Sequence, residues 1–205
     1  AVTMQKGTVF TSTVASGDYQ YVTNEDRTIT PENGVYKFNN VPLYEGTLVT
    51  FKYTNDVNDS DQKFLIPSDR ADTSTLKVTV QNRNTDTTQT VYSLAGGYND
   101  VSSDSKVYFI QEGSENKYEV YFGDGVTGKK AVDGNIVILD YVVTNGSEAD
   151  GASTFTPASS VGGYSDVTAL TTASAAGGGD AETVDSIKFN APLKYATQGR
   201  AVTPD

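Results

Sequence analysis

A glycine-rich segment in the second half of the chain has the spacing of a phosphate-binding turn. Gly123, Gly125 and Gly128 match GxGxxG, and they follow a run of alternating residues that predicts a strand. A dinucleotide site needs a helix next, because the helix N-terminus receives the pyrophosphate. Here residues 129–134 lead to another predicted strand. We therefore interpret the segment as a tight turn that glycine permits, and we expect no cofactor.

An acidic segment at residues 56–61 places carboxylates and amides at alternate positions, as calcium-binding loops do. A calcium loop of the EF-hand type needs Gly where Asp61 stands and a bidentate Glu where Pro67 stands. The pattern favours a solvated acidic turn, and we expect no metal.

Catalysis by imidazole or thiolate is excluded, because the chain contains neither His nor Cys. Paired carboxylates could hydrolyse glycosides, but none of the 26 acidic residues is singled out as one of a pair. The composition favours a protein that is not an enzyme. A carboxylate-only glycosidase or lyase is an alternative.

Tyrosines are frequent, and several could form platforms for sugar binding. Because they are spaced as strand residues and no Trp accompanies them, we expect core and cross-strand packing instead. A surface β-sandwich adhesin or glycan-binding module is the alternative function. The tyrosines concerned are Tyr92, Tyr98, Tyr108, Tyr118, Tyr121 and Tyr141.

The net charge of −11 and the pI near 4.4 oppose binding to nucleic acid, which requires clustered Lys and Arg. No run approaches the roughly 18 apolar residues that span a bilayer, and the first residues lack the apolar core of a signal peptide. We expect no membrane contact. The start without Met and the end at Asp205 indicate a fragment of a longer polypeptide.

Alternating apolar and polar residues, set among Gly, Asn and Asp turn signals, predict a mainly β fold. We expect antiparallel sheet or sandwich modules with a short C-terminal helical segment. Residues 106–111 and 117–122 form a predicted hairpin, and a further hairpin strand at 136–144 follows the Asp133-Gly134 turn. The predicted strands are residues 8–14, 35–38, 48–53, 76–81, 90–94, 107–111, 118–122 and 136–144.

Composition divides the chain into three parts. Residues 1–145 form a β-rich domain, with a break between two sub-modules near 55–75. Residues 146–179 are rich in Gly, Ser and Thr, which predicts a loop or arm rather than a core. The Gly and Ser content also predicts that this segment is a hinge, at which the chain changes conformation. Residues 180–205 carry a short helix that must dock on this chain or another, with Val184, Ile187 and Ala191 on its apolar stripe.

Several ordered motifs make the chain resemble the baseplate J-like family. Phe122, Gly123, Asp124, Gly125 and Gly128 match its FGDG-type turn after a strand. A strand that begins with Gly-Asn and ends in Y-x-x-T-x-G follows at 134–146, and a Gly-Gly-x-Asp/Glu helix start follows at 178–187. Upstream, residues 39–46 and 64–67 are similar to wedge proteins of T-even-type phages. The departure is a long insertion at 151–176.

The resemblance implies a structural subunit of a contractile-tail baseplate wedge. Such a subunit joins wedges around a central hub and changes its packing when the sheath contracts. It also implies a place in the virion after assembly in the host cytoplasm. The implied partners are other wedge proteins and further copies of the chain, in a homodimer or ring.

Overall fold

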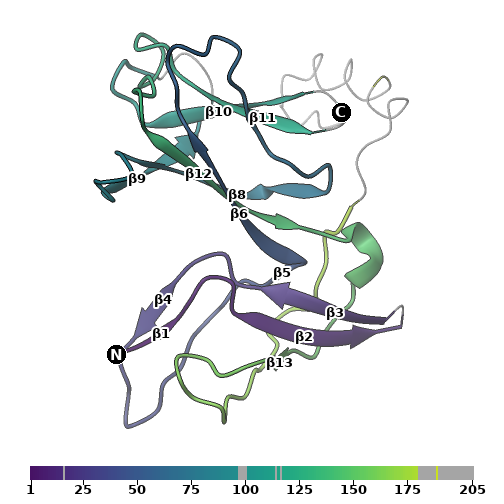
Figure 1. Ribbon diagram of the computed structural model, residues 1–205. Helices are drawn as coiled ribbons and strands as arrows, with labels where there is room; N and C mark the ends of the chain where they lie inside the picture. Colours follow the sequence, from purple (N-terminus) through teal and green to yellow (C-terminus); the bar gives the residue numbers. More distant parts are fainter. Residues whose placement is uncertain (16, 97–100, 114, 116, 180–187, 189–205) are drawn as a thin grey trace, which may run out of the picture.

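The computed structural model describes residues 1–15, 17–96, 101–113, 115, 117–179 and 188. The fold is mainly β, and its strands form three sheets. Figure 1 shows a large sheet above, two smaller sheets below, and strand β6 (Thr47–Thr54) leading from one unit to the other. The hydrophobic residues accordingly form two separate cores.

The large sheet has seven strands in the order β6-β12-β8-β9-β10-β11-β7. Neighbouring strands are antiparallel except β9 and β10, which pair in parallel over two residues. Besides β6, the strands are β7 (Phe64–Leu65), β8 (Ala71–Gln81), β9 (Gln89–Leu94), β10 (Val107–Glu112), β11 (Tyr118–Phe122) and β12 (Ile136–Val143).

Strand β12 lies in the interior of this sheet, between β6 and β8. Its sequence is an almost continuous apolar run, and every residue from Val137 to Val142 is buried. Such a run is typical of a strand that is covered on both faces. The register with β6 extends from Ile136 opposite Thr54 to Val143 opposite Thr47.

The sheet curls so that its two edge strands approach each other. Tyr53 of β6 donates a hydrogen bond to the carbonyl oxygen of Leu65 in β7, at 2.7 Å. The Tyr53 ring also meets the edge of the Phe64 ring, with centroids 5.6 Å apart. This curvature encloses the larger core, which includes Val78, Val120, Val137 and Leu139.

The lower unit contains a four-stranded sheet in the order β13-β2-β3-β5 and a separate pair, β1 with β4. Apolar side chains between these strands and the segment after residue 145 form the smaller core. The strands are β1 (Val2–Met4), β2 (Val9–Val14), β3 (Gly17–Val22), β4 (Arg27–Ile29), β5 (Tyr44–Glu45) and β13 (Thr156–Pro157).

Gly46 is the point at which the chain leaves the lower sheet and enters the large one. It has φ +119°, and its N–H donates to the carbonyl oxygen of Gln20 in β3 at 2.9 Å. A Cβ atom at this position would collide with the carbonyl oxygen of Val143. Only glycine therefore allows β5, β6 and the end of β12 to meet this closely.

Most of the predicted strands are confirmed, and so is the β10–β11 hairpin. The prediction of a strand at residues 35–38 was wrong, because the Asn33-Gly34 turn closes on a single bridge between Glu32 and Val35. The further hairpin was also wrong. After the Asp133-Gly134 turn the chain pairs with β6 and β8 rather than with β11, because β12 is apolar along almost its whole length and this central place buries every residue from Val137 to Val142.

Residues 145–179 contain mostly loop, a 3-10 helix (Gly146–Ala149) and β13, as their composition predicts. The expectation that they contribute no core was wrong, because Ala149, Ala152 and Val161 are buried in the smaller core. Small side chains pack closely here. The predicted 180–205 docking segment lies outside the described residues except for Lys188, so its stripe of Val184, Ile187 and Ala191 stays a prediction.

The domain boundaries and the hinge also stay predictions. β6 and β8, which flank the predicted break at 55–75, lie in the same seven-stranded sheet. The chain passes between the two units at Gly46 and again after β12 ends at Val143.

We predict that Gly46→Ala destabilises the protein far more than Gly34→Ala. Both glycines have positive φ, which costs about 1–2 kcal/mol for alanine, but only Gly46 has backbone in the way of a Cβ atom. We expect a loss of about 4 kcal/mol or more at Gly46, because a core contact must also give way. Urea unfolding measures both free energies, and equal losses would contradict the account of Gly46.

Candidate functional site

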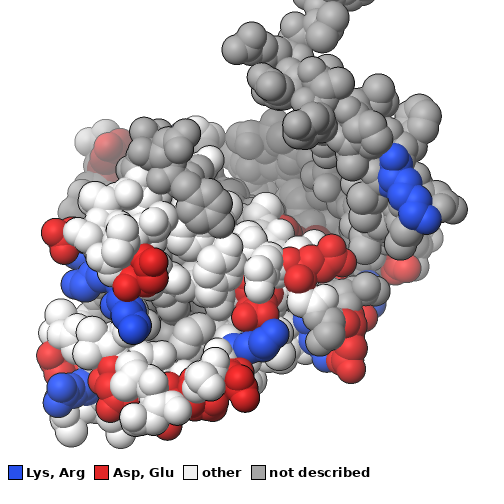
Figure 2. Space-filling view, turned by 90° about the horizontal axis from the view of Figure 1, so that it is seen from above, with Lys and Arg blue, Asp and Glu red and all other residues white. Residues whose placement is uncertain are grey.

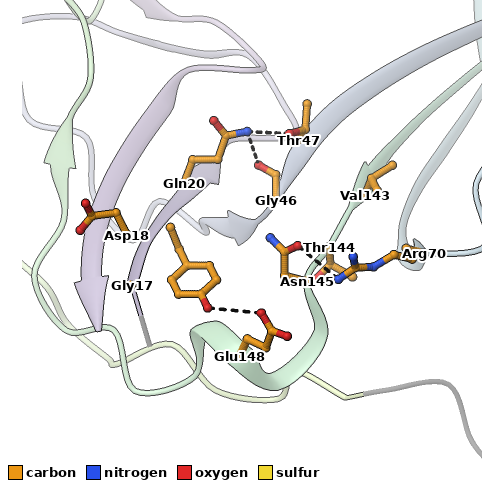
Figure 3. Close-up of a pocket in the computed structure, with 11 residues that line it drawn as sticks. Gly17, Asp18, Gln20, Gly46, Thr47, Arg70, Val143, Thr144, Asn145 and Glu148 are labelled. Atoms are coloured by element: carbon orange, nitrogen blue, oxygen red, sulfur yellow. Dashed lines mark hydrogen bonds between the residues drawn. The ribbon is translucent and has the colours of Figure 1, made fainter. Parts of the chain in front are cut away.

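A polar cleft of about 430 Å³ lies where the two units meet. Figure 3 shows its walls: β3 on one side, and the end of β12 with the 3-10 helix on the other. Gly46 and Thr47 line the cleft where the Gly46 N–H bonds β3. The lining residues are Gly17, Asp18, Tyr19, Gln20, Gly46, Thr47, Arg70, Val143, Thr144, Asn145 and Glu148.

Hydrogen bonds within the chain hold these walls in place (Figure 3). Gln20 Nε2 donates to the Gly46 carbonyl oxygen at 3.1 Å and to Thr47 Oγ1 at 2.6 Å. Tyr19 Oη donates to Glu148 Oε2 at 3.3 Å, which links β3 to the 3-10 helix. The cleft's polar groups thus form a joint between the two units.

Arg70 supplies the positive charge of the cleft. Its Nη2 donates to Asn145 Oδ1 at 3.2 Å, which connects the loop before β8 to the end of β12. The backbone adds a second connection, because the Thr144 N–H donates to the Arg70 carbonyl oxygen at 3.1 Å. These contacts fix the position at which the chain leaves the large sheet.

Glu45 fastens the other side of the same joint. Its Oε2 accepts hydrogen bonds from Thr144 Oγ1 at 2.7 Å and from the Asn145 N–H at 2.8 Å. Its Oε1 accepts from Asn145 Nδ2, also at 2.7 Å. Hydrogen bonds to a carboxylate are stronger than neutral ones, so this cluster is a strong polar link between β5 and the segment that follows β12.

A second link joins the N-terminal loop to the large sheet. Asp140, only 5% exposed, accepts from Lys6 Nζ at 2.8 Å and from Thr50 Oγ1. Asp140 lies on β12 opposite Thr50 of β6, so the ion pair crosses from the lower unit to the interior strand. A buried carboxylate without such partners would be strongly destabilising.

The family-motif residues Phe122, Gly123, Asp124, Gly125 and Gly128 are brought together in a tight turn. Gly123 lies so close to the backbone of Gly128 that a Cβ atom would collide with it. Asp124 Oδ1 accepts from the N–H groups of Val126 and Thr127, each at 2.8 Å, and these bonds hold the pKa of Asp124 below its usual value. The interpretation as a glycine-dependent turn is confirmed.

Phe122 anchors this turn to the larger core. Its ring makes edge contacts with the rings of Phe64 and Tyr92, with centroids 5.6 and 5.3 Å away. A role of the turn in partner binding stays a prediction.

The acidic segment at 56–61 caps its own backbone. Asp56 Oδ1 accepts from the Asn58 N–H at 2.9 Å, and Asp59 Oδ1 accepts from the Asp61 N–H at 3.0 Å. Among the described residues, no group of three or more acidic side chains is arranged to hold a metal ion.

The packing role of the tyrosines is confirmed for Tyr92, Tyr108 and Tyr141, which are buried in the larger core. Burial raises the pKa of each of these hydroxyl groups. Tyr118 and Tyr121 are half-buried, and Tyr98 lies outside the described residues.

Basic and acidic side chains are interspersed over most of the described surface shown in Figure 2. No broad basic surface is visible on that face. Within the described ranges, no helical segment has the length and hydropathy that crossing a membrane requires.

Sequence reasoning missed the joint of Glu45, Gln20 and Asn145. The sequence indicates turns at Glu45-Gly46 and Asn145-Gly146, and each does mark a place where the chain leaves a sheet. Their contact joins residues 100 positions apart, and no local pattern reports such a pairing.

Comparison with known proteins finds a distant relation. No family model matches the chain. Over 126 residues it is 27% identical to "Baseplate wedge protein gp6" of Enterobacteria phage T4. The chain is similar to a phage baseplate protein. The match covers 49% of this chain and 19% of the phage T4 protein, so the chain spans about a fifth of that relative's length. This likeness supports a baseplate-related family, as the sequence motifs predict.

We predict that Glu45→Ala lowers the free energy of unfolding by about 3 kcal/mol, because it leaves the Asn145 donors and the Thr144 hydroxyl without their acceptor. Glu115→Ala is the matched control, since it removes an exposed carboxylate from a surface ion pair and should leave the free energy of unfolding almost unchanged. Chemical denaturation compares the two variants. Similar small effects would mean that Glu45 does not hold the joint.

We predict that stability falls as the pH rises from 10 toward 12, with Tyr21 contributing. Tyr21 is 1% exposed and donates to the Ala149 carbonyl oxygen at 2.7 Å; burial, chiefly, raises its pKa to about 12. The unfolded chain loses this proton near pH 10, so the Tyr21 contribution is complete below that pH and disappears as the pH passes the folded pKa.

The measurement is the free energy of unfolding against pH for the wild type and for Tyr21→Phe. One tyrosine contributes a slope of about −1.4 kcal/mol per pH unit in this interval. Tyr21→Phe should be less stable at neutral pH by about 1 kcal/mol, and it should fall less steeply above pH 10. Identical slopes would contradict the assignment to Tyr21.

Proposed function

We propose that this chain is part of a structural subunit of a contractile-tail baseplate wedge. The observation that carries the proposal is the likeness to the wedge protein of phage T4, together with the FGDG-type turn. The turn is packed into the large sheet through Phe122 and Gly123, which suits a structural role better than a binding loop.

The architecture suits a part that must transmit force. Two β units are connected by Gly46, by the Glu45 hydrogen bonds and by the Lys6–Asp140 ion pair. These contacts couple motions of one unit to the other, as rearrangement of a baseplate requires.

The proposed partners are other wedge proteins and further copies of this chain, in a homodimer or ring around the hub. The proposed location is the tail baseplate of the virion, after assembly in the host cytoplasm. We also propose that the protein is not an enzyme and uses no cofactor. A net charge of −11 keeps free copies apart until a specific contact forms.

The alternative of a glycan-binding module has less support. Three of the six tyrosines that could have formed sugar platforms, Tyr92, Tyr108 and Tyr141, are buried in the larger core. A buried ring is not accessible for stacking on a sugar.

Immunogold electron microscopy of the particles that contain this protein tests the proposal. Antibodies against the folded chain should label the tail end of the particle that carries the baseplate, and mass spectrometry of purified baseplates should recover its peptides. Label on the capsid or on the cell surface, with no peptides in the baseplate fraction, would contradict the proposal.

A further inference from the structure

Strand β6 forms an edge of the large sheet, and its hydrogen-bonding direction can be assigned residue by residue. The Asn55 N–H donates to the Asn135 carbonyl oxygen at 2.7 Å, so Asn55 faces the β12 side. Backbone groups alternate along a strand, and therefore the even-numbered residues of β6 face outward. Two contacts agree with this assignment. Thr54 O accepts from Gln62 Nε2, and the Gly46 N–H donates to Gln20.

Between these two capped ends the edge is open. The outward residues are Leu48, Thr50 and Lys52, and β12 is the strand paired with β6. In the described part of the chain, no hydrogen bond reaches their backbone N–H and C=O groups. Buried strands pair such groups, so an open row of them is a template for another strand.

Side-chain exposure shows that this stretch is accessible. Thr50, Phe51 and Lys52 are consecutive and all exposed, so solvent reaches side chains on both faces of the strand there. The large Phe51 ring is 38% exposed and packs on Tyr53, with ring centroids 5.0 Å apart. By contrast, the other outermost strands in the described sheets have only two or three residues each.

The edge of β6 is complementary to itself. When two copies are placed antiparallel with Thr50 opposite Thr50, each Lys52 lies opposite Leu48 of the other copy. Every outward residue then meets an outward residue, which is what a ladder of paired N–H···O bonds requires. No like charges are opposed. Val49 lies opposite Phe51 of the second copy, a β-branched and aromatic pair that stabilises antiparallel strands.

We propose that β6 is a self-association surface, on which residues 48–52 pair antiparallel with the same residues of a second copy about a two-fold axis. The pairing is isologous and continues the large sheet across the two molecules. The proposal names the surface through which copies of the chain contact each other in the proposed wedge, and it rests on that proposed function for its biological setting. The register itself follows from the residues of β6.

The contact is short, so the isolated chain should associate weakly. A stable complex usually buries at least about 1,200 Å², more than one strand pair provides. The net charge of −11 adds repulsion between copies. Because salt screens that repulsion, the association should strengthen as ionic strength rises.

Sedimentation equilibrium of the full chain up to millimolar concentration, at low and high salt, measures the self-association. Lys52→Pro removes an outward N–H but leaves the β12 ladder intact, which an edge strand tolerates. It should weaken association about tenfold or more, because each of the two copies in the dimer loses one inter-strand hydrogen bond. Lys52→Ala, the matched control, keeps the N–H and should associate nearly as the wild type does.

A charge pair of variants tests the register without proline. Leu48→Glu places a carboxylate opposite Lys52 of the second copy and should strengthen association several-fold, although it makes each copy more negative. Leu48→Lys should weaken it, although it makes each copy less negative. The expected change in association for each variant is opposite to the change that net charge alone would cause. The two variants therefore report the pairing of β6 strands. Circular dichroism checks that each variant keeps its fold.

A chain that stays monomeric at millimolar concentration in high salt would overturn the proposal, as would self-association that none of these variants changes. Should Lys52→Pro fail to fold, the opposite signs at Leu48 decide. The wedge function is judged separately, because immunogold labelling of the tail does not depend on β6. Labelled baseplates with unaffected variants would leave the function standing and remove this surface.

Discussion

The joint between the two β units depends on one short sequence, Glu45-Gly46, which makes the smaller sheet and the larger sheet a single structure. Gly46 lets the backbone of β5 and β6 pass against Val143 where any side chain would collide. Glu45 then holds the neighbouring end of β12 through Thr144 and Asn145. The close backbone approach at Gly46 and the charge-assisted hydrogen bonds of Glu45 act at the same place. Together they hold the two units in the arrangement that forms the cleft.

The local pattern predicted the strands well and their partners poorly. The apolar run of β12 was identified as a strand, but its place between β6 and β8 depends on residues more than 50 positions away. Alternation reports which face of a strand is buried, whereas strand order is a property of the whole core. The segment at 145–179 shows the opposite error. Its small residues suggested a loose arm, yet Ala149 and Ala152 are small because they pack tightly in a core.

The candidate site was predictable only in part. The turn at Gly123–Gly128 carries its own geometric requirements, so glycine spacing alone was enough to interpret it. The joint of Glu45 with Asn145 consists of ordinary polar residues that become special only when folding brings them together. The likeness to a wedge protein of phage T4 is compatible with both features. A packed turn and a reinforced joint are properties of a part that must keep its shape inside an assembly.

The most direct test of the joint is native-state amide hydrogen exchange at two of its donors, the N–H groups of Gly46 and Asn145. If the two units form one cooperative structure, these amides exchange only with global unfolding, at the same free energy as the Leu139 amide in β12. Fast exchange at Gly46 and Asn145, while Leu139 stays protected, would show that the units move independently and would contradict the account.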